Sequence, residues 1–190
     1  MTEETETAKM SETKQKEQPA EKTEEQADPR QLLIKANETD NYDDKLKLYD
    51  EALALNPNYL DAWVQKGFAL DRNGRSEEAL ACYDRAIEID PENPGLRCLK
   101  GFAFNNLRKY EQSIECYDEV LSMNPDNVFS WSQKGSVLES LGRYNEAMDC
   151  YDRALKIDPT DYLLREKKQR LREMMYKKVS LEDSPDSGFN

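Results

Sequence analysis

The sequence predicts an all-α protein, an α-solenoid in which antiparallel helical hairpins are stacked on one another. The first observation is a phrase that occurs four times, as YDEALALNP, YDRAIEIDP, YDEVLSMNP and YDRALKIDP. Its closing prolines stand at positions 57, 91, 125 and 159, so the interval is 34 residues every time. The second observation is that apolar residues within each unit recur with the period of a helix. A unit of this size cannot bury its apolar face alone, so copies must stack.

Each unit is predicted to hold two helices joined by a tight turn. In the second unit, Trp63, Gly67 and Leu70 share one helical face, and a second apolar stripe follows further along. Gly74 lies between the stripes and is suited to the left-handed conformation that ends a helix. Gly142 stands at the equivalent position of the fourth unit.

Proline and polar capping residues mark the predicted helix ends. The proline that closes each unit has no amide hydrogen to donate and clashes with the preceding turn, so it stops the second helix. Asn93 and Asp28 each precede a proline, which is the pattern of a cap followed by the first helical residue. Asn127 and Asp161 are predicted to cap the first helices of the other units.

Gly67, Gly101 and Gly135 also lie 34 residues apart, in the middle of the first helices. Glycine costs about 1 kcal/mol there relative to alanine, so we expect the second helix to cross closely at this point. Small residues are expected to face the glycines and tyrosines to fill the space beside them; these are Ala79, Ser113 and Ala147, and Tyr83, Tyr117 and Tyr151.

This pattern resembles the tetratricopeptide repeat (TPR) family, whose signature of Trp, Leu-Gly, Tyr, Ala, Phe and Pro spans 34 residues. The second unit carries it as Trp63, Gly67, Leu70, Ala79, Tyr83, Ala86 and Pro91. The third unit has Arg97 where the Trp would stand. The resemblance covers about 28–177 and implies a right-handed superhelix with a concave groove.

The chain is predicted to divide into four parts, an acidic disordered tail at 1–27, a repeat array at 28–161, a basic capping helix at 162–178 and an acidic disordered tail at 179–190. Within the array we expect a degenerate repeat at about 26–59 and regular repeats at 60–93, 94–127 and 128–161. The tails lack the apolar residues needed to offset ordering entropy.

The residue inventory argues against catalysis. The chain has no histidine, hence no Ser-His or Cys-His pair and no imidazole metal ligand, and it has no glycine-rich phosphate loop. The carboxylate cluster at 40–44 lacks the glycine of a calcium loop. We therefore predict that the protein is not an enzyme and has no cofactor and no metal site.

Cysteine usage and hydropathy predict a cytoplasmic protein. No CxxC pair occurs, and Cys82, Cys116 and Cys150 occupy equivalent positions about 10 Å apart, given the spacing of packed helices. That distance is too long for a disulfide, so free thiols are expected. The N-terminal residues contain no hydrophobic segment that would serve as a secretory signal or membrane span.

In TPR proteins the first helices build the concave face, and the resemblance implies a groove here with an apolar centre and polar margins. The predicted partner-binding residues are Val64, Gln65, Phe68, Cys98, Leu99, Phe102, Phe129 and Gln133. Such a groove suits a helix or extended segment with hydrophobic anchors, so we predict a protein-binding adaptor or scaffold. The alternative is that the phenylalanines pack within the array or against the chain's own first helix.

The resemblance also bears on heat-shock proteins. Some TPR co-chaperones hold the carboxylate tail of these proteins with a clamp of Lys, Asn, Asn, Lys and Arg on the same positions. The residues at those positions here are Val64, Phe68, Leu99, Phe129 and Gln133, so the clamp is disfavoured.

Two other functions remain as alternatives. The basic helix could bind an anionic polymer or surface by counterion release, although nucleic acid is not expected because the body is acidic. The apolar residues of this segment fit a helix that covers the last hairpin and leaves its basic side solvated; they are Leu163, Leu164, Leu171, Met174 and Met175. Self-association through a poorly capped end is the second alternative.

A row of lysines departs from the family pattern. Lys66, Lys100 and Lys134 precede the central glycines, where the family usually has Leu. They could form a row of cations for an acidic ligand. The preferred interpretation is that each stem is buried and each ammonium group lies in water or on a nearby acid.

Overall fold

The computed structural model describes residues 28–182, and all regular structure within them is helical. The helices of this part are α1 (Pro29–Glu38), α2 (Tyr42–Leu55), α3 (Leu60–Arg72), α4 (Ser76–Ile89), α5 (Pro94–Asn106), α6 (Tyr110–Met123), α7 (Val128–Ser140), α8 (Tyr144–Ile157) and α9 (Tyr162–Glu182). The predicted disordered tail at 1–27 lies outside the described residues, and so does 183–190.

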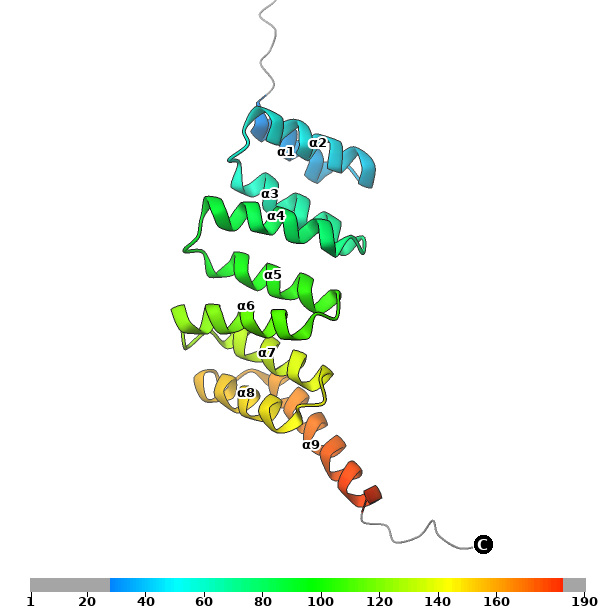
Figure 1. The fold of residues 1–190 in the computed structure, drawn as a ribbon, viewed down its shortest axis with the longest axis vertical. Coiled ribbons are helices and arrows are strands. Elements are labelled where there is room, and N and C mark those ends of the chain that lie inside the picture. The colour runs from blue at the N-terminus through cyan, green and yellow to red at the C-terminus, as the bar shows by residue number, and fades with distance from the viewer. Residues whose placement is uncertain (1–27, 183–190) are drawn as a thin grey trace, which may run out of the picture.

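The helices pack in successive pairs, α1 with α2, α3 with α4, α5 with α6 and α7 with α8. Each second helix also packs on the first helix of the following pair, and α8 packs on α9 in the same way. Figure 1 shows the pairs stacked along the long axis of the molecule, with α9 projecting from the last pair. The predicted fold class is confirmed, because the apolar stripes of neighbouring pairs are buried against each other.

Local signals set the helix ends as predicted. The Asn93 side chain accepts a hydrogen bond from the Gly95 amide at 3.0 Å, and Asp161 accepts one from the Leu164 amide at 3.0 Å. Gly74 and Gly142 adopt φ of +77° and +74° in the turns within their hairpins. In the third unit the equivalent residue is Arg108, which adopts φ of +57° although it is not a glycine.

The central glycines contact tyrosine rings directly. A Cβ atom at Gly67 would lie 2.7 Å from Cε1 of Tyr83, and one at Gly135 would lie 2.6 Å from Cε1 of Tyr151. The expected tyrosines therefore lie against the glycines, because a flat ring can pack on a backbone that carries no side chain. The small residues expected on the second helices, Ala79, Ser113 and Ala147, are fully buried in the same hairpins.

The contact at Gly101 in the third unit is looser. A Cβ atom there would be 3.1 Å from Cζ of Tyr117 and 3.2 Å from Cβ of Cys116. Ser113 is fully buried in this hairpin, and its hydroxyl donates to the carbonyl of Gly101 at 2.7 Å. This bond joins the second helix α6 to the backbone of the first helix α5.

The lysine row joins each unit to the one before it. The Nζ atoms of Lys66, Lys100 and Lys134 lie 2.5, 2.7 and 2.5 Å from carboxylate oxygens of the preceding unit. The lysine side chains are only 21, 29 and 20% exposed, so their stems are largely covered. The preferred interpretation is confirmed. The partner of each lysine is the Asp that follows Tyr in the repeated phrase, namely Asp50, Asp84 and Asp118.

A second contact repeats along the stack. The side chains of Trp63 and Trp131 each donate through Nε1, at 2.8 Å, to the carbonyl of the proline that closes the preceding unit. Arg97 and Arg165 donate to the equivalent proline carbonyls. Arginine can replace tryptophan at this position because both side chains present an N–H donor beyond an extended, partly apolar body.

Helix α9 has the register of the first helix of a fifth unit. Lys168 lies 34 residues after Lys134, and its Nζ forms an ion pair with Asp152 as the other lysines do with their partners. Leu164 and Leu171 are buried against the last hairpin. The helix ends at Glu182, four residues beyond the predicted range of 162–178, because the segment VSLE contains neither glycine nor proline.

Two of the residues of α9 that were predicted to cover the last hairpin do not cover it. Leu163 and Met174 are 55% and 38% exposed, whereas they were expected to cover the last hairpin. Adjacent residues of an α-helix point about 100° apart, so Leu163 cannot share the buried face of Leu164. No helix within residues 28–182 combines the length and hydropathy needed to span a membrane.

Candidate functional site

The three phenylalanines predicted to bind a partner are exposed. Phe68 on α3 and Phe102 on α5 are both 45% exposed, and Phe129 on α7 is 53% exposed. None of them belongs to the hydrophobic clusters found in the described part of the chain. Packing within the array, or against α1, therefore leaves about half of each side chain open.

Two further apolar residues extend this surface. Ile34 on α1 lies 34 residues before Phe68 and is 49% exposed. Leu163 on α9 lies 34 residues after Phe129 and is also exposed. Neither was predicted as a site residue, although the fixed interval of 34 residues would have identified both. We call these five exposed apolar residues the first-helix face; they are Ile34, Phe68, Phe102, Phe129 and Leu163.

The other predicted site residues differ in exposure. Gln65 is exposed, while Val64, Leu99 and Gln133 are half-buried, and Leu99 packs against the core cluster that contains Tyr83. Cys98 is also half-buried, with its Sγ atom 3.5 Å from Oγ of Ser130. Burial raises the pKa of the Cys98 thiol, so this side chain is a neutral part of the surface.

The central first helices contribute no unpaired charge to this face. The charged side chains of α5 are Arg97 and Lys100, and each forms an ion pair with a carboxylate of a second helix. Those of α7 are Lys134 and Glu139, which pair with Asp118 and with Arg170 on α9. The remaining polar groups of α5 and α7 are amides and hydroxyls, so the middle of the first-helix face is neutral.

A polar pocket lies at the N-terminal end of this face. It has a volume of about 440 Å³ and is lined by residues of α1, α2 and α3, among them Gln65 and Phe68. Lys45 and Arg72 bring two cations to it and Asp40 brings one carboxylate, and the Arg72 guanidinium lies 5.7 Å from the centre of the Phe68 ring. The charged side chains of the pocket are therefore net positive by one, so it can accept an acidic group next to an apolar surface.

The basic helix is less available than its composition suggests. Arg165, Lys167 and Lys168 contact the Pro159 carbonyl, the Ser136 hydroxyl and the Asp152 carboxylate. Arg170 lies 3.4 Å from Glu139, and Arg172 lies 5.9 Å from the centre of the Tyr176 ring. Much of the positive charge of α9 is therefore already engaged by the protein itself.

The buried thiols of α4, α6 and α8 are not activated nucleophiles. Burial raises the pKa of the Cys82, Cys116 and Cys150 thiols to about 11, so they are not nucleophilic thiolates at neutral pH. All four thiols are free. Within 28–182, no three side chains of metal-ligating type come together to hold a metal ion. The arrangement is that of a binding surface.

Comparison with protein families supports this view of the repeats. Family models described as tetratricopeptide repeat match residues 60–93, 94–127 and 128–161. Comparison with curated proteins gives no match.

Solved structures with the same arrangement include several repeat proteins. A crystal structure of MamA superposes with a TM-score of 0.63 at 16% identity, covering 70% of this chain and 78% of MamA. The Arabidopsis OM64 TPR domain gives a TM-score of 0.56 at 25% identity, covering 60% of this chain and 95% of that domain. The first TPR of Spaghetti (RPAP3), bound to an HSP90 peptide, gives 0.56 at 21% identity, covering 62% of this chain and 93% of that one.

Proposed function

The chain belongs to the tetratricopeptide repeat family, whose models match more than half of it, and on that premise we propose a non-catalytic adaptor that binds a peptide or helix of a partner protein through the first-helix face. The observation that carries the proposal is the exposure of Phe68, Phe102 and Phe129 on three consecutive first helices. Large apolar side chains that lie close together on a surface are typical of protein-binding sites.

The chemistry of the face indicates the kind of segment that would bind. Its centre is apolar and neutral. Covering it with apolar side chains would therefore remove apolar surface from water without burying an unpaired charge. Lys45 and Arg72 at one end favour an acidic group on the ligand. We propose a segment with apolar anchors and an acidic residue near the end that lies on α1–α3.

We do not propose that this chain holds the carboxylate tail of a heat-shock protein with a clamp of the kind seen in TPR co-chaperones. The Spaghetti structure is described as bound to an HSP90 peptide, and it supports peptide binding by this fold in general. In this chain the five clamp positions hold uncharged residues, so a peptide carboxylate would find no cation on them. A cytoplasmic location likewise stays a prediction from the sequence.

Affinity enrichment from the native cell extract tests the proposal. Wild-type protein is compared with the double variant Phe68→Ser/Phe102→Ser and with a matched control, Leu55→Ser/Met123→Ser, which removes exposed apolar residues from the second helices instead. Proteins that are lost from the phenylalanine variant and retained by the control would be the partners. Retention of every bound protein by both variants would rule out the first-helix face.

Binding of an anionic polymer through α9 is the second candidate. The exposed Lys177, together with Arg172, leaves some positive charge on its surface. Replacing Arg172 and Lys177 with Gln should abolish such binding. The wild-type affinity should then also fall steeply with salt, because counterion release drives this kind of association. Salt-independent binding would favour the first-helix face.

A further inference from the structure

Within the described residues, α9 has no following helix of the kind that every other first helix packs on. In each of the four hairpins, the first helix packs on the second helix of its own unit. Helix α9 has the register of a first helix, but within 28–182 no second helix follows it. In the regular units a central glycine of the first helix contacts a tyrosine ring. The equivalent residue of α9 is Gln169, which stands 34 residues after Gly135.

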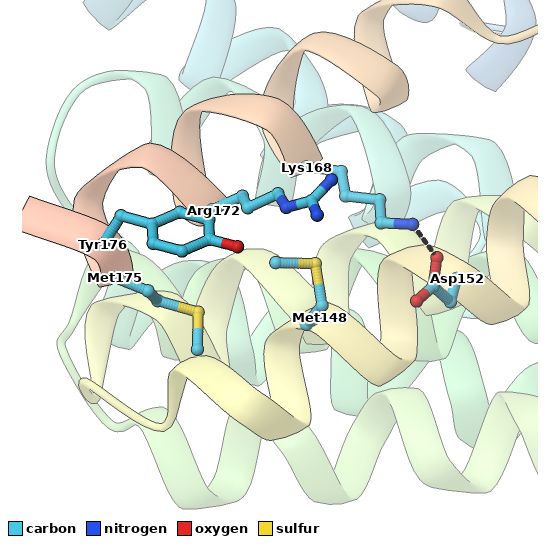
Figure 2. Close-up of a pocket in the computed structure, with 6 residues that line it drawn as sticks. All are labelled: Met148, Asp152, Lys168, Arg172, Met175 and Tyr176. Carbon is cyan, nitrogen blue, oxygen red and sulfur yellow. Dashed lines mark hydrogen bonds and ion pairs between the residues drawn. The ribbon is translucent and has the colours of Figure 1, made fainter. Parts of the chain in front are cut away.

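A notch of about 550 Å³ lies between α8 and α9, where a fifth second helix would pack. Figure 2 shows the side chains that line it, with Met148 from α8 and Met175 from α9 bringing their sulfur atoms into it. Arg172 and Tyr176 lie along the α9 side, and Lys168 pairs with Asp152 at one end. The notch thus has an apolar floor and a basic edge.

The inner units show what covers the equivalent surface. Ile114 lies 34 residues before Met148, and it packs against the cluster that contains Ala147 and Cys150 of the following second helix. Leu46, a further 68 residues before Ile114, packs against the cluster that contains Ala79 and Cys82. In each case the covering helix carries two small residues three positions apart. Met148 has no such helix within the described chain.

The inner units also show a charge that the notch lacks. Glu78 directly precedes Ala79, and its pKa is lowered by the hydrogen bond from Arg75 and also by the charge of Lys66. Glu146 directly precedes Ala147 and lies near Lys134 in the same way. In the second and fourth units the second helix therefore brings an acidic side chain towards the lysine of its own first helix, whereas the third unit has Gln112 at this position. Lys168 has no equivalent carboxylate from a following helix.

We propose that the notch between α8 and α9 is a second protein-binding site, which takes an amphipathic helix of a partner protein. The partner helix presents small side chains at positions i and i+3 to Met148 and Met175. The residue of the partner helix that directly precedes position i is acidic, and its carboxylate lies beside Lys168 and Arg172. Helix-in-groove binding of this kind would complete the stack by one further layer.

Gln169 sets the specificity of this site. In the inner units the tyrosine that follows the second small residue inserts against the central glycine. On α9 the equivalent position holds Gln169, whose exposed side chain donates to Glu173 at 2.9 Å, so no bare glycine backbone is present to receive a ring. The notch therefore disfavours a helix with an aromatic residue at i+4, which includes the second helices of this chain. In α4, α6 and α8 the small residues are moreover buried within their own hairpins, so a second copy of the chain offers no free helix of this type.

A peptide with the sequence of residues 75–90 is a suitable probe, with Cys82→Ala and Tyr83→Ala so that it keeps Glu78 and Ala79. Labelled probe is titrated with the full chain, and binding is followed by fluorescence anisotropy. A control probe carries Ala79→Leu in addition. We expect saturable binding of the first probe and binding at least about tenfold weaker for the control, since the bulky side chain cannot enter next to Met148.

Variants of the protein locate the site. Arg172→Glu, which changes an exposed side chain, should lower the affinity for the probe at least about tenfold. Arg153→Glu, on another side of α8, should leave the affinity unchanged. Gln169→Gly should allow a probe that retains Tyr83 to bind more tightly than it binds wild type. Phe68→Ser/Phe102→Ser should have no effect, which separates this site from the first-helix face. Circular dichroism confirms that each variant remains helical.

Three results would overturn the proposal. The first is no saturable binding of the probe, and the second is equal binding to wild type and the Arg172→Glu variant. The third is a dimer of the full chain in sedimentation velocity that dissociates in the Arg172→Glu variant, because a second copy would then occupy the notch.

Discussion

The ring of Tyr151 on α8 lies against the backbone of Gly135 on α7, so close that a Cβ atom at position 135 would be 2.6 Å from Cε1. The tyrosine is fully buried, and its hydroxyl donates to Glu139 at 3.0 Å. Burial and the neighbouring Glu139 raise the pKa of Tyr151 to about 12. The neutral ring thus holds the two helices of the hairpin together, and the glycine is required by its neighbour rather than by its own backbone angles.

Gly135→Ala should destabilise the protein by about 1–3 kcal/mol, because the added methyl group overlaps a ring that has no room to move. Gly101→Ala should cost less, since its Cβ would lie 3.1 Å from the nearest atom of Tyr117. Urea denaturation measures both changes. In a Tyr151→Ala background the Gly135→Ala substitution should become nearly neutral, and an unchanged cost there would show that the contact is not the cause.

Arg108→Gly should stabilise the protein by roughly 1 kcal/mol, because glycine adopts a left-handed φ without the steric cost that other residues have. The side chain is exposed, so little packing is lost. Gly142→Arg is the matched opposite change at the equivalent turn and should destabilise by a similar amount. Thermal or urea unfolding of the two variants should give shifts of opposite sign.

Phe68→Ser and Phe102→Ser together should change the free energy of unfolding by less than about 1 kcal/mol, since exposed side chains leave no cavity when they are shortened. Leu138→Ala on the buried side of α7 should cost about 2–5 kcal/mol. The comparison is made by urea denaturation. A large loss of stability in the double phenylalanine variant would assign these rings to the core.

Stability should fall as the pH rises from 9 to 11. The thiols of Cys82, Cys116 and Cys150 have an ordinary pKa of 9.0, and burial raises it to about 11 in the folded protein. Above pH 9 the unfolded chain loses these protons first and therefore binds fewer of them, so the equilibrium shifts towards unfolding. The contribution of each thiol is present in full below pH 9 and is on the order of 2 kcal/mol.

The measurement for the thiols is the pH dependence of the urea midpoint. The triple variant with Ala at 82, 116 and 150 should show a much shallower decline between pH 9 and 11. Buried tyrosines, whose pKa values are raised from an ordinary 10.0, contribute above pH 10 and should account for the loss that remains. Identical curves for wild type and the variant would mean that the thiols ionise equally in both states.

The parts of this fold that depend on near neighbours were predictable from the sequence. Asn93 caps a helix through an amide two residues away, and Gly74 closes a turn through its own backbone angles. Because the units repeat every 34 residues, the same caps and turns could be predicted in the other units. The same interval would have identified Ile34 and Leu163 as members of the first-helix face, and Lys168 as the sign that α9 begins a fifth unit.

The sequence alone determined the helices, their caps, the repeat and the family, because these depend on contacts within a few residues and on a fixed period. Only the tertiary structure decided which apolar residues are covered. Leu164 is buried while its neighbour Leu163 is exposed, and Met148, which packs against the last core cluster as Ile114 does, also borders a notch. Burial depends on which helix packs on a residue from another unit, and that requires the helices to be arranged in space.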